Sequence, residues 1–223
     1  MNLAALMLAD SRFPGGGHVH SGGLEEAVAR RAVTDEPSLR SFLVGRLRTA
    51  GALSAVFASA ACRGRYAELD AELDARTPSP AQRDASRVQG RGIARAARKA
   101  WPSPALAELL GVTPRPHHPV IVGVLVGDPF EAAQVVAYHA VTGPATGAIR
   151  LLGLDPFGVN AVLARLAPDI DEVARMAADH ADTPPEDLPA PSAPGLDLLA
   201  EAHDRHRHHH DRHHSEEVRL FVS

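Results

Sequence analysis

Apolar side chains recur along most of the chain at the three- and four-residue spacing of amphipathic helices. The longest example covers residues 35–63, where leucines and phenylalanines mark one broad buried face. It follows Thr34-Asp35-Glu36-Pro37, which combines a capping side chain, acidic residues and a proline in the first turn. Similar patterns predict a buried helix over 2–9 and further helices over 24–33, 66–76, 81–101, 105–110, 128–141 and from 155 to about 180, with a break at Pro168.

Two segments fit this helical pattern poorly. Residues 120–126 are rich in β-branched side chains and would form a buried strand on propensity alone. Residues 142–147 contain turn-forming residues, so a break is expected there before the apolar segment 148–154.

Composition favours helices and a soluble protein. Of the 223 residues 45% are hydrophobic and only 4% aromatic, and alanine is abundant, which suits closely packed helices. We therefore expect an all-α fold, a single-domain bundle of about eight to ten helices with a flexible C-terminal tail. We place the helical domain at 1–181, a Pro-rich linker at 182–195, and a His-rich, partner-binding tail at 196–223.

The charge and cysteine content argue against several classes of protein. The net charge of -4 argues against nucleic-acid binding, and no run of about 18 uncharged apolar residues predicts a membrane span. The N-terminus lacks the basic region of a signal peptide, and the single Cys62 excludes an intrachain disulfide. A cytoplasmic location is expected.

The N-terminal loop, residues 14–23, holds five glycines together with His18 and His20. So many glycines predict a loop shaped for tight turns or close backbone approach. The phosphate-binding pattern G-x-x-x-x-G-K-[ST] is absent. Ser21 is expected to cap the helix that begins near Leu24.

Two other segments carry imidazole side chains. His117 and His118 precede Pro119 and suit a helix-entry loop with hydrogen-bonded rings. A metal-dependent hydrolase would need His117 and His118 to lie close to His18 and His20. The tail concentrates seven further histidines, which are candidate ligands for nickel, zinc or copper: His203, His206, His208, His209, His210, His213 and His214.

The tail allows several interpretations. It could be a metal store, a low-complexity tract without a role or, least of all, an expression tag. Its apolar ending, Val218 to Val222, would instead dock into a groove on this protein or on a partner. In the helix over 81–101, Arg83, Arg87 and Arg91 share one face, which is either solvated or a docking surface for an acidic partner. No Ser-His-Asp or Cys-His spacing indicates a catalytic site, so no catalytic residue is assigned.

Several of these motifs together resemble the UreF family of urease accessory proteins. The resemblance lies in Leu8-Ala9-Asp10-Ser11, Pro14, Gly16, His20-Ser21, Gly23-Leu24-Glu25, His117-His118-Pro119-Val120, Ala137-Tyr138, Ala148-Ile149-Arg150-Leu151, Pro194 to His203, Arg219-Leu220-Phe221 and Ser223. Two departures stand out. Gly153-Leu154-Asp155-Pro156 replaces a Gly-Gln pair that often follows in the family, and the His tract is inserted before Arg219.

The resemblance implies an all-α protein that forms a homodimer and has a helix over 120–126. It implies a non-enzymatic adaptor that joins UreD (also called UreH) and the GTPase UreG on apo-urease for GTP-dependent nickel insertion. The implied partner-binding residues are Arg150, Arg219, Leu220 and Phe221. No intrinsic cofactor is expected, and nickel would bind only transiently.

Overall fold

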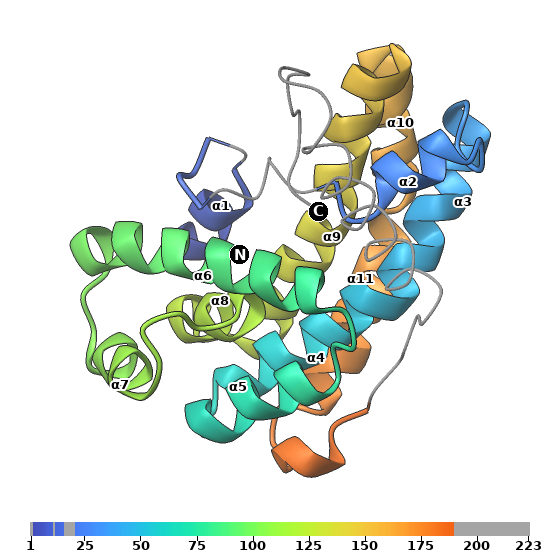
Figure 1. The fold of residues 1–223 in the computed structure, drawn as a ribbon. Coiled ribbons are helices and arrows are strands. Elements are labelled where there is room, and N and C mark those ends of the chain that lie inside the picture. Colours follow the sequence, from blue (N-terminus) through green and yellow to red (C-terminus); the bar gives the residue numbers. More distant parts are fainter. Residues whose placement is uncertain (1, 11, 16–20, 190–223) are drawn as a thin grey trace, which may run out of the picture.

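The computed structural model describes residues 2–10, 12–15 and 21–189. Within these ranges every regular element is helical, so the all-α prediction is confirmed (Figure 1). The α-helices are α1 Leu3–Ala9, α2 Leu24–Ala29, α3 Glu36–Arg46, α4 Ala52–Ala61, α5 Tyr66–Ala75, α6 Pro80–Ala100, α7 Pro104–Val112, α8 His118–Val126, α9 Pro129–Leu152, α10 Pro156–Arg165 and α11 Ala167–Asp179. A π-helical turn, Leu47–Gly51, joins α3 to α4, and a 3-10 turn spans Pro185–Asp187.

Helix α4 lies at the centre of the bundle. It packs against α8, α9 and α11, and every one of its residues except Ser54 is buried. A helix that is apolar on all sides must be enclosed by others. Helices α6 and α5 lie outside this group, with α6 packed against α8 (Figure 1).

Helix α8 contains the β-branched run that propensity alone assigns to a strand. Its local boundaries are helical, with Pro119 in the first turn and Gly127 in the left-handed conformation at the C-terminal end, φ 74°. Most of the helix is buried, including Val120, Ile121 and Val122. Tertiary packing therefore outweighs β-propensity, and the helix implied by the resemblance is confirmed.

Helix α8 approaches α4 closely at Gly123. A Cβ on Gly123 would overlap the carbonyl oxygen of Ala58 and lie 2.7 Å from the Cβ of Ala61. The Cys62 thiol donates a hydrogen bond to the Gly123 carbonyl at 3.3 Å. Only a residue without a side chain allows the two backbones to pack at this distance.

Helix α9 is continuous from Pro129 to Leu152, so the predicted break over 142–147 is wrong. Pro144 lies inside the helix and has no N–H to donate to the carbonyl of Ala140. Arg46 supplies the missing donor, because its Nε lies 3.0 Å from the Ala140 oxygen. A side chain from another helix thereby satisfies the group that Pro144 leaves unpaired.

Helix starts agree well with the sequence. Asp35, Asp128 and Asp155 each cap a helix with a carboxylate oxygen and have a proline in the first turn that follows. The break near Pro168 is also found, since α10 ends at Arg165 and Pro168 lies in the first turn of α11. Acid-proline pairs are strong start signals because they act locally.

Two expectations at the N-terminus are wrong. Ser21 does not cap α2, whose N-cap is Gly23 with φ 89°. The Ser21 hydroxyl is instead buried without a hydrogen-bond partner among the described residues. Helix α1 is only partly buried: Ala5 and Leu8 face the core, whereas Leu3 is 69% exposed and Leu6 58% exposed.

The described part of the predicted linker, residues 182–189, packs onto the domain. Leu188 is buried, and the Arg76 guanidinium of α5 donates to the backbone carbonyls of Pro185, Glu186 and Leu188. This stretch is therefore not a free extended linker. The domain boundaries themselves stay a prediction, and residues 190–223 lie outside the described part.

The contact at Gly123 yields a stability prediction. Gly123→Ala should lower the free energy of unfolding by about 1–3 kcal/mol, because the added methyl group overpacks the α4–α8 contact. The matched control is Gly45→Ala on α3, where a Cβ would meet nothing within 4 Å. That control should be neutral or stabilising by about 0.5–1 kcal/mol. Urea denaturation compares both, and equal effects would contradict the packing account.

Candidate functional site

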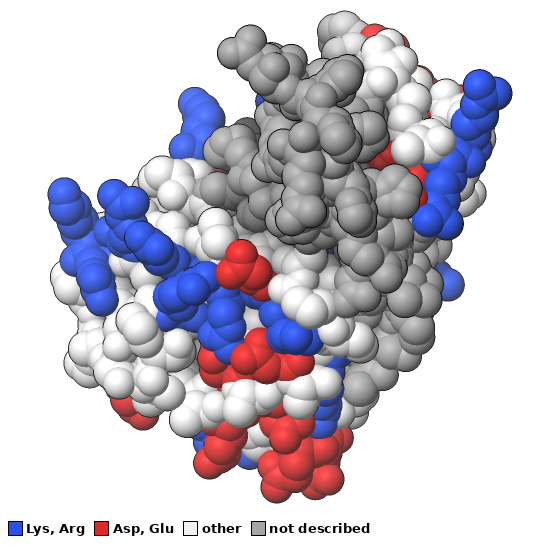
Figure 2. All heavy atoms as spheres, viewed as in Figure 1, with Lys and Arg blue, Asp and Glu red and all other residues white. Residues whose placement is uncertain are grey.

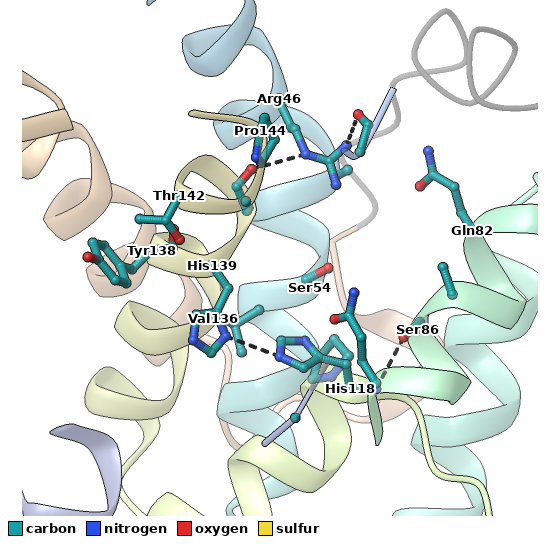
Figure 3. A pocket seen from close by; sticks show the side chains of 18 of the residues that line it. Arg46, Ser54, Gln82, Ser86, His118, Val136, Tyr138, His139, Thr142 and Pro144 are labelled. Carbon is teal, nitrogen blue, oxygen red and sulfur yellow. Dashed lines mark hydrogen bonds between the residues drawn. The ribbon is translucent and has the colours of Figure 1, made fainter. Parts of the chain in front are cut away.

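A cavity of about 400 Å³ opens between the N-terminal segment and helices α4, α6, α8 and α9. Figure 3 shows its lining from close by. Apolar walls come from Leu8, Leu53, Ile93 and Val136 among others. Ser54, the one α4 residue that is not buried, lines it too. The cavity therefore lies between the central helices α4, α8 and α9 and the outer helices α1 and α6.

Neutral polar groups supply much of the remaining lining. The amides of Gln82 and Gln89 and the hydroxyl of Ser86 come from successive turns of α6, and Thr142 comes from α9. The Nε2 atom of Gln82 is buried and has no hydrogen-bond partner among the described residues. The charged side chains of Asp10, Arg46 and Arg76 also belong to the lining, so the cavity combines apolar, neutral polar and charged groups.

Two histidines from different helices meet at this cavity. His118 Nε2 of α8 lies 3.2 Å from His139 Nδ1 of α9, and the rings point toward one another (Figure 3). His139 Nε2 lies 3.0 Å from the carbonyl oxygen of Leu8. Because a carbonyl can only accept, the His139 proton is on Nε2, and its Nδ1 accepts from His118.

Burial keeps the His139 ring neutral. It lowers the pKa of His139 to about 4, although the hydrogen bond to the Leu8 carbonyl acts in the opposite direction. At neutral pH the His139 ring is therefore uncharged and keeps a lone pair on Nδ1.

His117 has a different environment from its neighbour. It is fully buried, with Nε2 2.9 Å from an oxygen of Asp74 and Nδ1 3.0 Å from the hydroxyl of Ser86. Burial lowers the pKa of His117, and the positive charge of Arg87 acts in the same direction. Both ring nitrogens already have partners, so His117 is a structural residue, as the helix-entry interpretation predicts.

A partly buried ion network surrounds His117. Arg87 of α6 binds Asp70 at 2.9 Å, binds Asp74, and donates to the Arg115 carbonyl at 2.7 Å. The Asp70 carboxylate also accepts the His117 backbone N–H at 2.9 Å. Burial alone would raise the pKa of Asp74, but hydrogen bonds from Arg87 and His117 outweigh it and lower that pKa. The network fixes the segment that enters α8.

The predicted basic face of α6 therefore has two parts, one engaged inside the protein and one exposed. Arg87 is internal, and Arg83 donates to the carbonyls of Thr77 and Pro78. The exposed part of the helix carries Arg91, Arg95, Arg98 and Lys99. Figure 2 shows basic side chains gathered along α6, beside acidic side chains over α5.

Arg46 joins the N-terminal loop to the middle of α9. Besides its bond to Ala140, it donates from Nη1 to the carbonyl of Gly22 at 2.8 Å (Figure 3). This residue therefore ties Gly22, near the end of the loop, to α9. Sequence reasoning missed both Arg46 and His139, because neither lies in a local motif with its partners.

The other predicted site residues are only partly described. Arg150 lies exposed in the last turn of α9. His18, His20, the seven tail histidines, Arg219, Leu220 and Phe221 lie outside the described residues. Within the described ranges, no three His, Cys, Asp or Glu side chains lie close enough together to hold a metal ion. The same ranges contain no helix both long and apolar enough to cross a membrane.

Comparisons with known proteins agree on one family. Residues 33–167 match the family model described as UreF. The chain is 48% identical over 204 residues to the urease accessory protein UreF of Mycobacterium sp. strain JLS, covering 89% of this chain and 92% of that protein. It is 45% identical to the protein of the same name from Mycolicibacterium vanbaalenii, with the same coverage. The Mycobacterium tuberculosis H37Rv protein of that name is 47% identical over 211 residues, covering 91% of this chain and 95% of its own length.

The ion network yields the prediction for this region. Arg87→Met should lower the free energy of unfolding by about 3 kcal/mol, because it leaves Asp70 buried without its cation. Arg91→Met, one turn along the same helix and exposed, should change it by less than about 0.5 kcal/mol. Thermal and urea denaturation measure both. A loss of equal size in the two variants would contradict the assigned network.

Proposed function

Since this chain belongs to the UreF family of urease accessory proteins, we propose that it works as a non-enzymatic adaptor in urease maturation. In this proposal it assembles with UreD (UreH) and the GTPase UreG on apo-urease. GTP hydrolysis by UreG then drives nickel insertion into the urease active site. The observation that carries the proposal is identity of 45–48% to proteins named urease accessory protein UreF over about nine-tenths of the chain.

The chemistry of the described side chains supports an adaptor. His117, Asp70, Asp74 and Arg87 are engaged with one another and hold helices together. The thiol of Cys62 is also unsuited to nucleophilic attack, because burial raises its pKa to about 12. These groups serve the fold and have no arrangement suited to bond cleavage.

Exposed apolar side chains support a role in assembly. Leu3, Leu6 and Met7 lie on the outer side of α1, and Phe157 at the start of α10 is 84% exposed. Covering an exposed apolar side chain removes it from water, and this favours binding of a partner. We propose that α1 and the apolar tail ending contact UreD, that the chain forms a homodimer, and that it acts in the cytoplasm.

The tail has a second candidate role as a nickel store. The histidines from His203 to His214 could collect nickel without any docking. The two roles rest on different residues, since docking uses the apolar ending and storage uses the imidazoles. They can therefore be tested separately in the full-length chain.

We predict that Leu220→Asp with Phe221→Asp abolishes co-purification with UreD, because each substitution places a charge in an apolar contact. The control replaces all seven tail histidines with Asn and should retain UreD. Circular dichroism should show an unchanged helical content in both variants. Retention of UreD by the Asp variant would contradict the docking role. Loss of urease activation in the Asn variant that excess nickel restores would favour storage.

A further inference from the structure

We propose that the C-terminal half of α6 is a docking surface for an acidic helix of another protein. The surface, here called the basic stripe, consists of Arg91, Arg95, Arg98 and Lys99, and all four residues are exposed. Their positions follow the three- and four-residue spacing that places side chains on one face of a helix. The inference rests on the charges of this chain and is independent of the proposed adaptor role.

The first half of α6 shows how an acidic helix meets such a row of arginines. Arg87 binds Asp70 at 2.9 Å and also binds Asp74, and Arg83 Nε lies 4.0 Å from Asp74 Oδ1. Asp70 and Asp74 are four residues apart on α5, as Arg83 and Arg87 are on α6. Acidic side chains at helical spacing therefore neutralise basic side chains at the same spacing within this protein.

The basic stripe continues the same row without acidic neighbours. Residues 85–107 contain five cations and no Asp or Glu. Among the residues that the structure describes, no carboxylate forms an ion pair with any of the four cations of the stripe. Like charges three or four residues apart destabilise a helix. An acidic partner would remove this repulsion in the same way that α5 neutralises the first half of α6.

The helix itself accounts for only part of the stripe. Arg98 and Lys99 lie in the last turn of α6, where cations interact favourably with the negative end of the helix dipole. That interaction falls off within one turn, so it does not explain Arg91 and Arg95. These two arginines are therefore the residues on which the inference depends.

The size and surroundings of the stripe favour a protein helix over a nucleic acid or a membrane. From residue 91 to residue 99 the helix rises about 12 Å, at about 1.5 Å per residue, which matches two turns of a second helix. Val88 is 47% exposed and lies one turn before Arg91, so the surface has an apolar edge. Acidic side chains over α5 lie beside the basic ones (Figure 2) and would repel the phosphates of a larger anionic surface.

A second copy of this chain fits the stripe less well. The α5 acids that have the matching spacing, Asp70 and Asp74, already bind Arg87. The partner is therefore a different protein, with carboxylates at four-residue spacing over at least two helical turns. Exposed ion pairs are weak and screened by salt, so the contact sets orientation and association rate more than affinity.

The test uses the full-length chain and a fluorescent, alanine-based helical peptide of about 20 residues, a length at which such helices form. Glutamates at every fourth position give this peptide one acidic stripe, and a comparison peptide has the same composition with its glutamates spread around the helix. Fluorescence anisotropy at low salt should show at least fivefold tighter binding of the striped peptide. Arg91→Glu together with Arg95→Glu should weaken that binding at least tenfold. The variant should instead bind a peptide with lysines in place of the glutamates.

The matched control is Arg165→Glu together with Arg175→Glu. Both arginines are exposed, on α10 and α11, and the change in net charge is the same. This control should alter the affinity less than twofold. If the Arg91 and Arg95 variant fails to fold by circular dichroism, Arg91→Gln with Arg95→Gln replaces it and should also weaken binding.

Several results would overturn the inference. Equal affinity for the two peptides, or an equal loss in the two Glu variants, would mean that the stripe is only a solvated face. Tighter binding of a single-stranded RNA or of phosphatidylserine vesicles through Arg91 and Arg95 would assign the surface to another class of partner. Self-association that the same substitutions abolish would assign it to a second copy. The UreD test uses Leu220 and Phe221, so the two proposals fail separately.

Discussion

The close approach of α8 to its neighbours is the constraint on which the rest of the structure depends. On one side, Gly123 lets α8 pack against the backbone of α4. On the other, a Cβ at Gly90 of α6 would overlap the carbonyl oxygen of Pro116, just before α8 begins. At these two points the backbone of α8, or of the segment that enters it, lies directly against α4 and α6. Its position brings His118 to His139, sets His117 within the ion network and forms one wall of the cavity.

Much of the fold could be predicted from local signals. Acid-proline pairs located the starts of α3, α9 and α10, and apolar spacing located α5, α6 and α7, because these features act within one or two turns. Local signals gave the wrong secondary structure where contacts with residues distant in the sequence determine it. Pro144 resembles a helix break in the sequence, but Arg46, nearly a hundred positions earlier, satisfies the carbonyl that it exposes. The helical conformation of residues 120–126 was predicted only from the family resemblance, because α4 and α6, which bury this segment, are distant in the sequence.

The candidate site was predicted less well for the same reason. The pair His117-His118 was visible in the sequence, but their opposite roles were not, since each depends on residues from other helices. His139 carried no local signal at all. The basic spacing on α6 was real, yet Arg87 belongs to the interior and only the C-terminal half of the helix presents exposed cations. The resemblance identified the family, whereas the role of each individual side chain follows only from its tertiary contacts.

The charged groups of the ion network described above hold helices together, and we propose that the exposed apolar groups bind other proteins. The most direct test is native mass spectrometry after co-expression with UreD, UreG and apo-urease. The account predicts a stable assembly whose mass includes this chain together with UreD and UreG. Detection of this chain only by itself, while the other proteins assemble without it, would contradict the central claim.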